Sequence, residues 1–279
     1  MAARGALAIV AAIALAGCNA ASPAGINLAA GSACLPPTSL TDRDDDLSIF
    51  GDGICASATT FEERGTRWTV HTFDSGRRGP LFVLPHDDEN AALGTAAWAL
   101  RTHGGVATVV ESGGSRFVGG TDPNRNFDAN ALDCRRPGGR SPRFVEAMLA
   151  PRNRPVIALH TNARGAAATG GAGSVSIRAP YAGSEAFPSE EATGGRRSED
   201  AMVILASRSG ARDPQVRRRV ERLNRAGVHV LVETVDPART DCSLSHYAVM
   251  NGIRYANVEV AHGETGTQIE ILDILIGSL

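Results

Sequence analysis

From about Thr66 to the end of the chain, short apolar runs alternate with stretches of helical periodicity, and this alternation constrains the fold more than any other feature. The predicted strands are residues 68–73, 80–84, 106–111, 155–159, 201–207, 228–235 and 255–260. The predicted helices are residues 89–102, 141–149, 213–226 and 267–276. Strands that alternate with helices indicate a sheet covered by helices on both faces. We therefore expect a single α/β domain over residues 46–279, with a mixed, mostly parallel central sheet.

Composition and charge agree with a globular protein of this kind. The chain has 279 residues, of which 43% are hydrophobic, and this is enough for a sizeable core. Its basic residues are all arginine, and the 30 acidic residues slightly outnumber the 28 basic ones. A cationic face is therefore not indicated, and we expect no nucleic-acid partner.

One segment breaks the alternation of strands and helices. Residues 163–200 are rich in Gly, Ala and Ser and contain the stretches "ARGAAATGGAGSVSIRAP" and "SEEATGGRRSED". A long segment of this composition inside a domain indicates a surface loop or a lid over a site.

The N-terminus has the pattern of a bacterial export signal. Arg4 precedes an apolar run, residues 6–16, that is too short to span a bilayer as a helix. The run ends in Leu-Ala-Gly-Cys18, which resembles the lipobox of bacterial lipoproteins. The resemblance implies that residues 1–17 are removed and that Cys18 is lipidated. Residues 18–45 are then a tether, and the domain faces the periplasm or the cell exterior, anchored without spanning the membrane.

Four further cysteines, Cys34, Cys55, Cys134 and Cys242, lie beyond the predicted lipidation site. In an exported protein two disulfides are more natural than a metal cluster, whose ligands normally come in close pairs. Three pairings are possible. We favour Cys34 with Cys55 and Cys134 with Cys242, although the sequence leaves the choice open.

A histidine and a glutamate follow the predicted strand at residues 80–84. His86 and Glu89 are three residues apart at the start of the next helix, so both side chains can reach one point. Ligand-binding residues in open α/β sheets gather beyond the carboxyl ends of the strands, which is where this pair lies. With one more histidine they would form the set of two His and one Glu that holds catalytic zinc and leaves a position open for water.

Three later segments supply the other groups that such a site needs. "VIALHTN" ends a predicted strand in His160, and "DPNRNF" places Asn124 and Arg125 in a polar loop. "GIRYANVEVAHG" puts Glu259 inside a predicted strand between apolar neighbours, a costly position for a carboxylate without a partner. These segments, in this order after His86 and Glu89, resemble the zinc carboxypeptidase family of the carboxypeptidase A type.

The resemblance extends over residues 69–266 and implies a Zn²⁺ cofactor. It implies that the zinc ligands are His86, Glu89 and His160.

The same resemblance implies roles for residues around the metal. Arg125, with Asn124, would bind the free carboxylate of the substrate, and Glu259 would be the general base. Arg116 would stabilise the oxyanion, and Tyr247 is the nearest counterpart of the family's mobile substrate-binding tyrosine. The structural alternatives are an ion pair of Arg125 with Asp122 and a solvated Arg116. Asp87 or Asp88 could cap the helix that follows.

We therefore expect a metallocarboxypeptidase that hydrolyses a peptide amide next to a free carboxylate. The predicted export makes cell-wall stem peptides a natural substrate. A zinc deacylase of the succinylglutamate desuccinylase or aspartoacylase type, acting on N-acyl amino acids, is the alternative, since "LHTN" is similar to the "LHT" of those enzymes. A binding lipoprotein without turnover is a third hypothesis. Side-chain preference, the choice of membrane and oligomeric state are left open.

Overall fold

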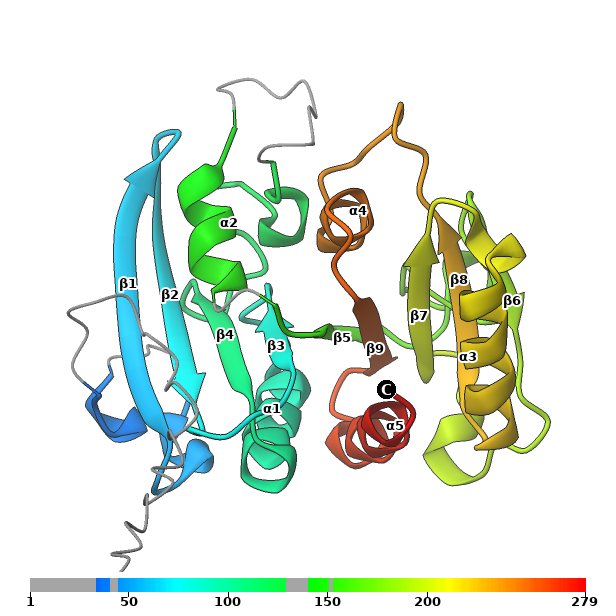
Figure 1. The fold of residues 1–279 in the computed structure, drawn as a ribbon, viewed down its shortest axis with the longest axis horizontal. Helices are drawn as coiled ribbons and strands as arrows, with labels where there is room; N and C mark the ends of the chain where they lie inside the picture. The colour runs from blue at the N-terminus through cyan, green and yellow to red at the C-terminus, as the bar shows by residue number, and fades with distance from the viewer. Residues whose placement is uncertain (1–33, 41–44, 129–139, 151–152) are drawn as a thin grey trace, which may run out of the picture.

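The computed structural model describes residues 34–40, 45–128, 140–150 and 153–279, and the strands within these ranges form one sheet (Figure 1). The strands are β1 (Cys55–Glu63), β2 (Thr66–Asp74), β3 (Leu81–Leu84), β4 (Val106–Glu111), β5 (Val156–Asn162), β6 (Ser184–Phe187), β7 (Met202–Ser207), β8 (His229–Thr234) and β9 (Tyr255–Ala261). Their order across the sheet is β1-β2-β4-β3-β5-β9-β7-β8-β6. The predicted α/β fold is confirmed.

The sheet is mixed, with its parallel strands at the centre. β4, β3, β5 and β9 are parallel neighbours, and β7 is parallel to β8. The remaining pairs, β1–β2, β2–β4, β7–β9 and β6–β8, are antiparallel, so parallel pairs make up half of the described pairings rather than most of them. Every residue of β3, β5 and β9 is buried, as is typical of parallel strands covered on both faces.

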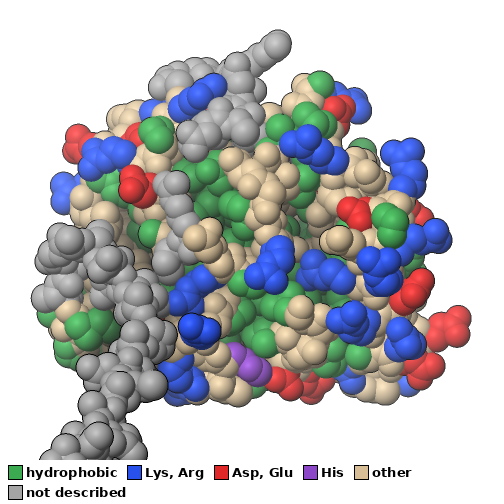
Figure 2. All heavy atoms as spheres, viewed as in Figure 1, with side chains coloured by type: hydrophobic (Ala, Val, Ile, Leu, Met, Phe, Trp, Pro, Cys, Tyr) green, Lys and Arg blue, Asp and Glu red, His purple; other side chains and the backbone are tan. Residues whose placement is uncertain are grey.

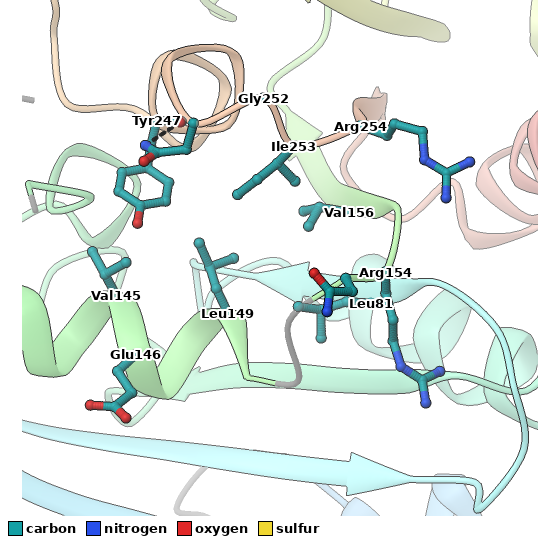
Figure 3. Close-up of a pocket in the computed structure, with 12 residues that line it drawn as sticks. Leu81, Val145, Glu146, Leu149, Arg154, Val156, Tyr247, Gly252, Ile253 and Arg254 are labelled. Atoms are coloured by element: carbon teal, nitrogen blue, oxygen red, sulfur yellow. Dashed lines mark hydrogen bonds between the residues drawn. The ribbon is translucent and has the colours of Figure 1, made fainter. Parts of the chain in front are cut away.

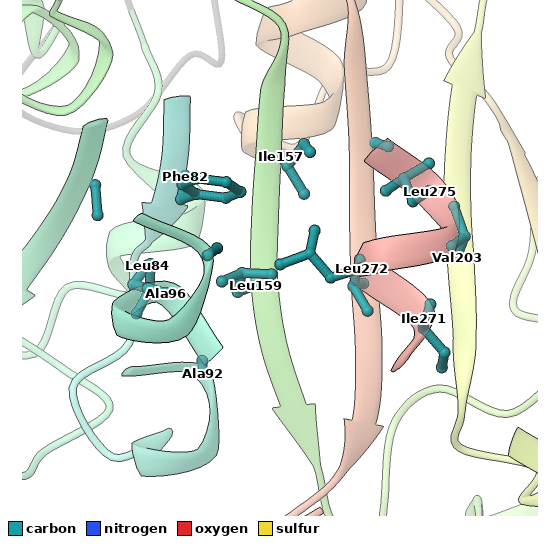
Figure 4. Close-up of a cluster of buried hydrophobic side chains, with 14 of the residues drawn as sticks. Phe82, Leu84, Ala92, Ala96, Ile157, Leu159, Val203, Ile271, Leu272 and Leu275 are labelled. Atoms are coloured by element: carbon teal, nitrogen blue, oxygen red, sulfur yellow. The ribbon is translucent and has the colours of Figure 1, made fainter. Parts of the chain in front are cut away.

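Helices cover both faces of this sheet. They are α1 (Asn90–His103), α2 (Pro142–Leu149), α3 (Pro214–Arg225), α4 (Leu244–Met250) and α5 (Thr265–Gly277). Phe82 and Leu84 of β3 pack in a cluster with α1 and α5 (Figure 4), and α3 belongs to the same cluster. Leu81 and Val83 pack in a second cluster with α2 and α4. Successive side chains of a strand point to opposite faces, so one short strand contributes to both halves of the core.

Three elements were not predicted from the sequence, and each has a weak apolar pattern. β1 is an edge strand with exposed residues on one face, and it pairs with β2 through a tight turn at Arg64 and Gly65, whose φ angles of 54° and 72° suit such a hairpin. β6 lies within the segment 163–200, which is therefore not all loop or lid. α4 has only seven residues.

The described N-terminal residues are joined to the domain. Cys34 and Cys55 form the predicted disulfide, and Leu35 forms a β-bridge with Ala56, so the end of the predicted tether lies against β1. Cys242 is also disulfide-bonded. Cys134, Cys18 and the whole predicted signal peptide lie outside the described residues. No helix in the described part of the chain is both long and apolar enough to cross a bilayer.

The packing of α5 gives a test of this core. Leu272 is fully buried between α5 and the sheet. We expect Leu272→Ala to lower the free energy of unfolding by about 2 to 5 kcal/mol, because it removes buried methyl groups and leaves a cavity. Leu279→Ala, at a side chain that is 48% exposed, should change it by no more than about 0.5 kcal/mol. Denaturant unfolding of both variants measures the difference, and equal effects would contradict the assigned core.

Candidate functional site

The central parallel strands bring four predicted site residues to one edge of the sheet. His86 and Glu89 follow β3 directly, His160 lies near the end of β5, and Glu259 lies near the end of β9. β3 pairs with β5 and β5 with β9, so the carboxyl ends of all three strands meet there. His160 and Glu259 are register partners, which places their side chains on the same face of the sheet.

His86, Glu89 and His160 converge on one point, and the three residues are buried. One ligand atom from each lies within 4.8 Å of those of the other two. The Nδ1 atom of His86 is 2.8 Å from Oε1 of Glu89, and Nδ1 of His160 is 3.2 Å from Oε2 of the same carboxylate. The backbone N–H of Thr161 also donates to Oε2 at 2.8 Å. The cluster could hold a metal ion, and two imidazoles with one carboxylate suit a divalent transition metal.

The orientation of the His86 ring is fixed, with Nδ1 facing Glu89 in the cluster. Its other ring nitrogen, Nε2, lies 2.9 Å from Oδ1 of Asp122, and the same oxygen accepts the backbone N–H of Asn124 at 2.8 Å. A carboxylate behind a ligating histidine holds the proton on the outer nitrogen and leaves the inner one free for a metal. Sequence reasoning considered Asp122 only as an ion-pair partner of Arg125. Its position on a polar loop gave no sign that it would contact His86.

Charge within the cluster also favours a cation. Burial alone would lower the pKa of His86, but its hydrogen bonds to Asp122 and Glu89 outweigh burial and raise the pKa to about 9. Burial alone would raise the pKa of Glu89, but attraction and hydrogen bonds from His160 and His86 bring it well below its usual range. Both shifts reflect the pairing of protonated imidazoles with the carboxylates of Glu89 and Asp122, which is favourable for positive charge. A divalent cation would supply that charge.

Glu259 lies beside the cluster as a buried carboxyl group that is 7% exposed. Burial raises its pKa, the attraction of His160 opposes that rise, and the charge of Glu89 adds to it. Nδ2 of Asn257 donates to Oε1 of Glu259 at 3.0 Å. A carboxylate whose pKa is raised is a stronger base than a solvated one.

Arg116 reaches the cluster from the loop after β4. Its guanidinium donates to Oε1 of Glu89 at 3.1 Å, while its side chain is 41% exposed. The loop is held by Asp87, whose Oδ2 accepts the backbone N–H groups of Ser112 at 2.6 Å and Gly114 at 2.9 Å. Asp87 therefore positions the loop of Arg116 rather than capping α1, whose N-cap position is occupied by Glu89.

Arg125 belongs to a row of alternating charges next to this site. Its Nε lies 3.4 Å from Oδ2 of Asp241, so its ion-pair partner is Asp241 rather than Asp122. Nδ1 of His246 lies 3.3 Å from Oδ1 of Asp241, and its Nε2 lies 3.4 Å from Oε1 of Glu233. His246 lies on α4 within this row. The neighbouring Asn124 is turned towards α4, where its Oδ1 accepts the backbone N–H of Leu244 at 3.3 Å.

The structure does not bring Tyr247 to this site. Its ring is 6% exposed and packs near Phe127, with ring centroids 6.3 Å apart. It points towards Val145 and Leu149 of α2 in a pocket of about 470 Å³ (Figure 3). That pocket also includes Leu81 and Val156, the first residues of β3 and β5, so it lies at the opposite edge of the sheet. The predicted role of Tyr247 is corrected, because its ring is part of the core.

A different tyrosine is influenced by the charge of the predicted base. Burial raises the pKa of Tyr181, and the negative charges of Glu233 and Glu259 raise it further. Tyr181 comes from the segment 163–200 and packs partly against the core residues Met202 and Leu231. Sequence reasoning missed it, since a single aromatic residue in a stretch rich in small residues was the only signal.

Comparison with known proteins adds little to this geometry. No family model and no curated protein matches the chain. Among solved structures, the crystal structure of a candidate carboxypeptidase from Burkholderia mallei aligns with a TM-score of 0.40 at 13% identity. The alignment covers 83% of this chain and 64% of that one. A likeness this distant gives no information about activity. The candidate site is therefore defined by the contacts between its own residues.

The metal site makes a direct prediction. The protein is expected to bind one divalent ion per chain, and His160→Ala should abolish tight binding because it removes a ligand. Asp122→Asn should weaken binding by about 10- to 100-fold, since it loosens the outer contact of His86. Equilibrium dialysis against Zn²⁺ with elemental analysis measures both effects. His103→Ala, at a histidine paired instead with Asp273, is the matched control. Equal metal content in the His160 and His103 variants would rule out this cluster as the site.

Proposed function

We propose that the protein is a zinc-dependent metallocarboxypeptidase, which hydrolyses the peptide amide next to a free carboxylate. The observation that carries this proposal is the convergence of buried His86, Glu89 and His160, with Glu259 on the adjacent strand. A donor set of this kind suits a catalytic metal, and a protonatable carboxyl group beside it suits proton transfer. The order of the motifs along the chain supports the same assignment.

Glu259 is proposed as the group that moves the proton. When bound, zinc would supply the Lewis acidity that polarises the scissile carbonyl. Glu259 would take the proton of the attacking water and pass it to the leaving amine, which requires a carboxyl group within one hydrogen bond of both. Its burial supports this role, because burial raises its pKa and so makes its carboxylate a stronger base towards the attacking water.

Arg116 is proposed to stabilise the oxyanion that forms at the scissile carbonyl. It already contacts Glu89, and its half-exposed side chain can turn towards a substrate. One preorganised donor of this kind contributes about 3 to 4 kcal/mol in comparable sites.

Arg125 is proposed to hold the substrate carboxylate. Its ion pair with Asp241 is long, at 3.4 Å, and the two side chains are 42% and 43% exposed. A substrate carboxylate could replace that contact, since an arginine binds a carboxylate through two parallel charge-assisted hydrogen bonds. Asn124 would support the loop through its bond to α4 rather than contact the substrate.

We also propose that the protein is exported and anchored to a bacterial membrane through a lipid on Cys18. This rests on the lipobox-like sequence alone. Cell-wall peptides are then the proposed substrates, because they are the peptides that an enzyme in that compartment meets. The Cys34–Cys55 disulfide supports an oxidising environment.

Mass spectrometry of reaction products tests the proposed activity. A soluble form that starts after Cys18 is incubated with stem peptides, ordinary peptides and N-acyl amino acids, with and without a chelator. Chelator-sensitive release of one C-terminal residue is expected. Release of an acyl group would move the protein to the zinc deacylases, and zinc binding without any product would favour a binding lipoprotein.

The assigned base makes a sharper prediction. Glu259→Gln should retain the metal and lose about 10²- to 10⁴-fold in kcat, because the amide cannot take the proton. Glu185→Gln, at an exposed position on β6, is the matched control and should keep full activity. Metal content and turnover are measured on the same samples. A Glu259 variant with wild-type turnover would exclude this residue as the base.

The assigned carboxylate-binding residue predicts a difference between substrates. Arg125→Ala should raise KM for free-acid substrates by about tenfold or more, the effect of losing a hydrogen bond to a charged group, and change little for their C-terminal amides. Arg239→Ala, at a nearby arginine whose side chain is 85% exposed, should affect neither. Steady-state kinetics on matched acid and amide pairs make the comparison. Equal losses on both substrates would mean that Arg125 acts otherwise.

A further inference from the structure

A second hollow lies at the edge of the sheet opposite the candidate metal centre. It has a volume of about 260 Å³ and lies between the first residues of β5 and β9, the helix α3 and the end of the chain. Val156 and Tyr255 line it, and His160 and Glu259 lie four residues further along the same strands. At about 3.3 Å per residue, roughly 13 Å of sheet separates the two places. A molecule in this hollow is therefore not the group that reacts at the metal centre.

Four arginines line this hollow: Arg218, Arg219 and Arg222 from α3, and Arg254 from the loop before β9. Among the described residues that line it, none has an acidic side chain. None of these arginines makes an ion pair within the described part of the chain; Arg222 donates instead to the backbone carbonyl of Ser278 at 2.6 Å. The hollow thus gathers four positive side chains, and no acidic side chain in the described part of the chain forms an ion pair with them.

This arrangement differs from other arginines of the same protein. Arg196 pairs with Glu270, and Arg239 pairs with Asp236. On α3 itself, Arg217 and Arg225 line a different hollow, which contains Glu221. Basic side chains gather over α3 and towards the middle of that face of the molecule (Figure 2).

Partial burial raises the free-energy cost of the unpaired charge on Arg219. Arg219 is half-buried, and burial, followed by repulsion from Arg222 and Arg254, lowers its pKa. Arg218, Arg222 and Arg254 are exposed, but all four arginines line one hollow and so lie near one another. An anion in that hollow would relieve the repulsion.

We propose that this hollow is a binding site for a phosphate group, held by Arg219 and Arg254 with Arg218 and Arg222 at its rim. The planar guanidinium donates two parallel hydrogen bonds to an oxyanion such as phosphate. A phosphate monoester carries about −1.5 to −2 charges at pH 7, which offsets several guanidinium charges better than a single carboxylate does. A volume of about 260 Å³ admits such a group.

The phosphate could belong to a soluble phosphate compound or to the headgroup of a phospholipid. Both offer the same oxygens to the same arginines. The experiment therefore has one arm for each source, and either arm can support the site.

The test uses the full chain. In the first arm, inorganic phosphate is titrated into the protein by calorimetry at constant ionic strength, with chloride as the reference anion. In the second arm, the protein is mixed with vesicles of phosphatidylcholine with and without phosphatidylglycerol, and sedimentation measures the bound fraction. Any lipid at Cys18 would contribute equally with both vesicle types, so only the dependence on phosphatidylglycerol is read.

Arg219→Gln and Arg254→Gln should each weaken binding by about tenfold or more, because each removes a charged donor. Arg217→Gln, which removes the same charge from the same helix but does not line this hollow, should bind like the wild type. In chloride alone, the thermal stability of the Arg219 and Arg254 variants should equal or exceed that of the wild type, since repulsion is relieved. Their metal content should not change.

Each outcome of these measurements either supports or overturns the proposed phosphate site. Phosphate binding that is lost in both variants supports the site with a soluble ligand, and binding only to phosphatidylglycerol vesicles supports it with a lipid headgroup. No binding in either arm would overturn the proposal, and so would an equal loss in the Arg217 variant, which would reveal an effect of net charge alone. If one variant fails to fold, the other decides.

Discussion

The in-register parallel pairing of β3, β5 and β9 is the constraint on which the candidate site depends. This pairing places the residues after β3, the end of β5 and the end of β9 at one edge, so that His86, Glu89, His160 and Glu259 meet although they are far apart in sequence. A shift of one residue between β5 and β9 would turn His160 and Glu259 to opposite faces. Apolar clusters on both faces of these strands fix the register, because a shift would also expose their core residues.

Burying so many ionisable groups costs stability unless each is paired. Glu89 offsets that cost with contacts to His86, His160, Arg116 and the backbone N–H of Thr161. Other residues position these partners. Asp122 fixes the ring of His86, and Asp87 fixes the loop of Arg116. Nε2 of Gln268 donates to the backbone carbonyl of His160 at 2.8 Å. The cluster is thus organised for positive charge by groups outside His86, Glu89 and His160, and these three side chains could hold a metal ion.

The sequence predicted those parts of the molecule whose signal is local. The central strands are short apolar runs, and the residues that end them could be recognised because strand ends are where α/β sheets place functional groups. β1 and β6 were missed because edge strands need few apolar residues. The contacts of Asp122 with His86 and of Asp241 with Arg125 were missed because both acids lie on loops that only the folded chain brings to their partners. Tyr247 was chosen for its place in the segment before the strand of Glu259, and that place does not determine which face of the short helix α4 turns to the core.

The row formed by Arg125, Asp241, His246 and Glu233 suggests how a substrate carboxylate would be received. Burial disfavours charge on His246, but its hydrogen bond to Glu233 and the attraction of Asp241 outweigh burial and raise its pKa, so positive and negative groups alternate along the row. If a substrate carboxylate displaces Asp241 from Arg125, an ion pair between Arg125 and the substrate replaces the ion pair between Arg125 and Asp241. Asp241 keeps His246 as a partner, so no carboxylate is left unpaired. Recognition of a free carboxylate then costs little desolvation at Arg125, whereas an uncharged amide could not compete with Asp241 for the same guanidinium.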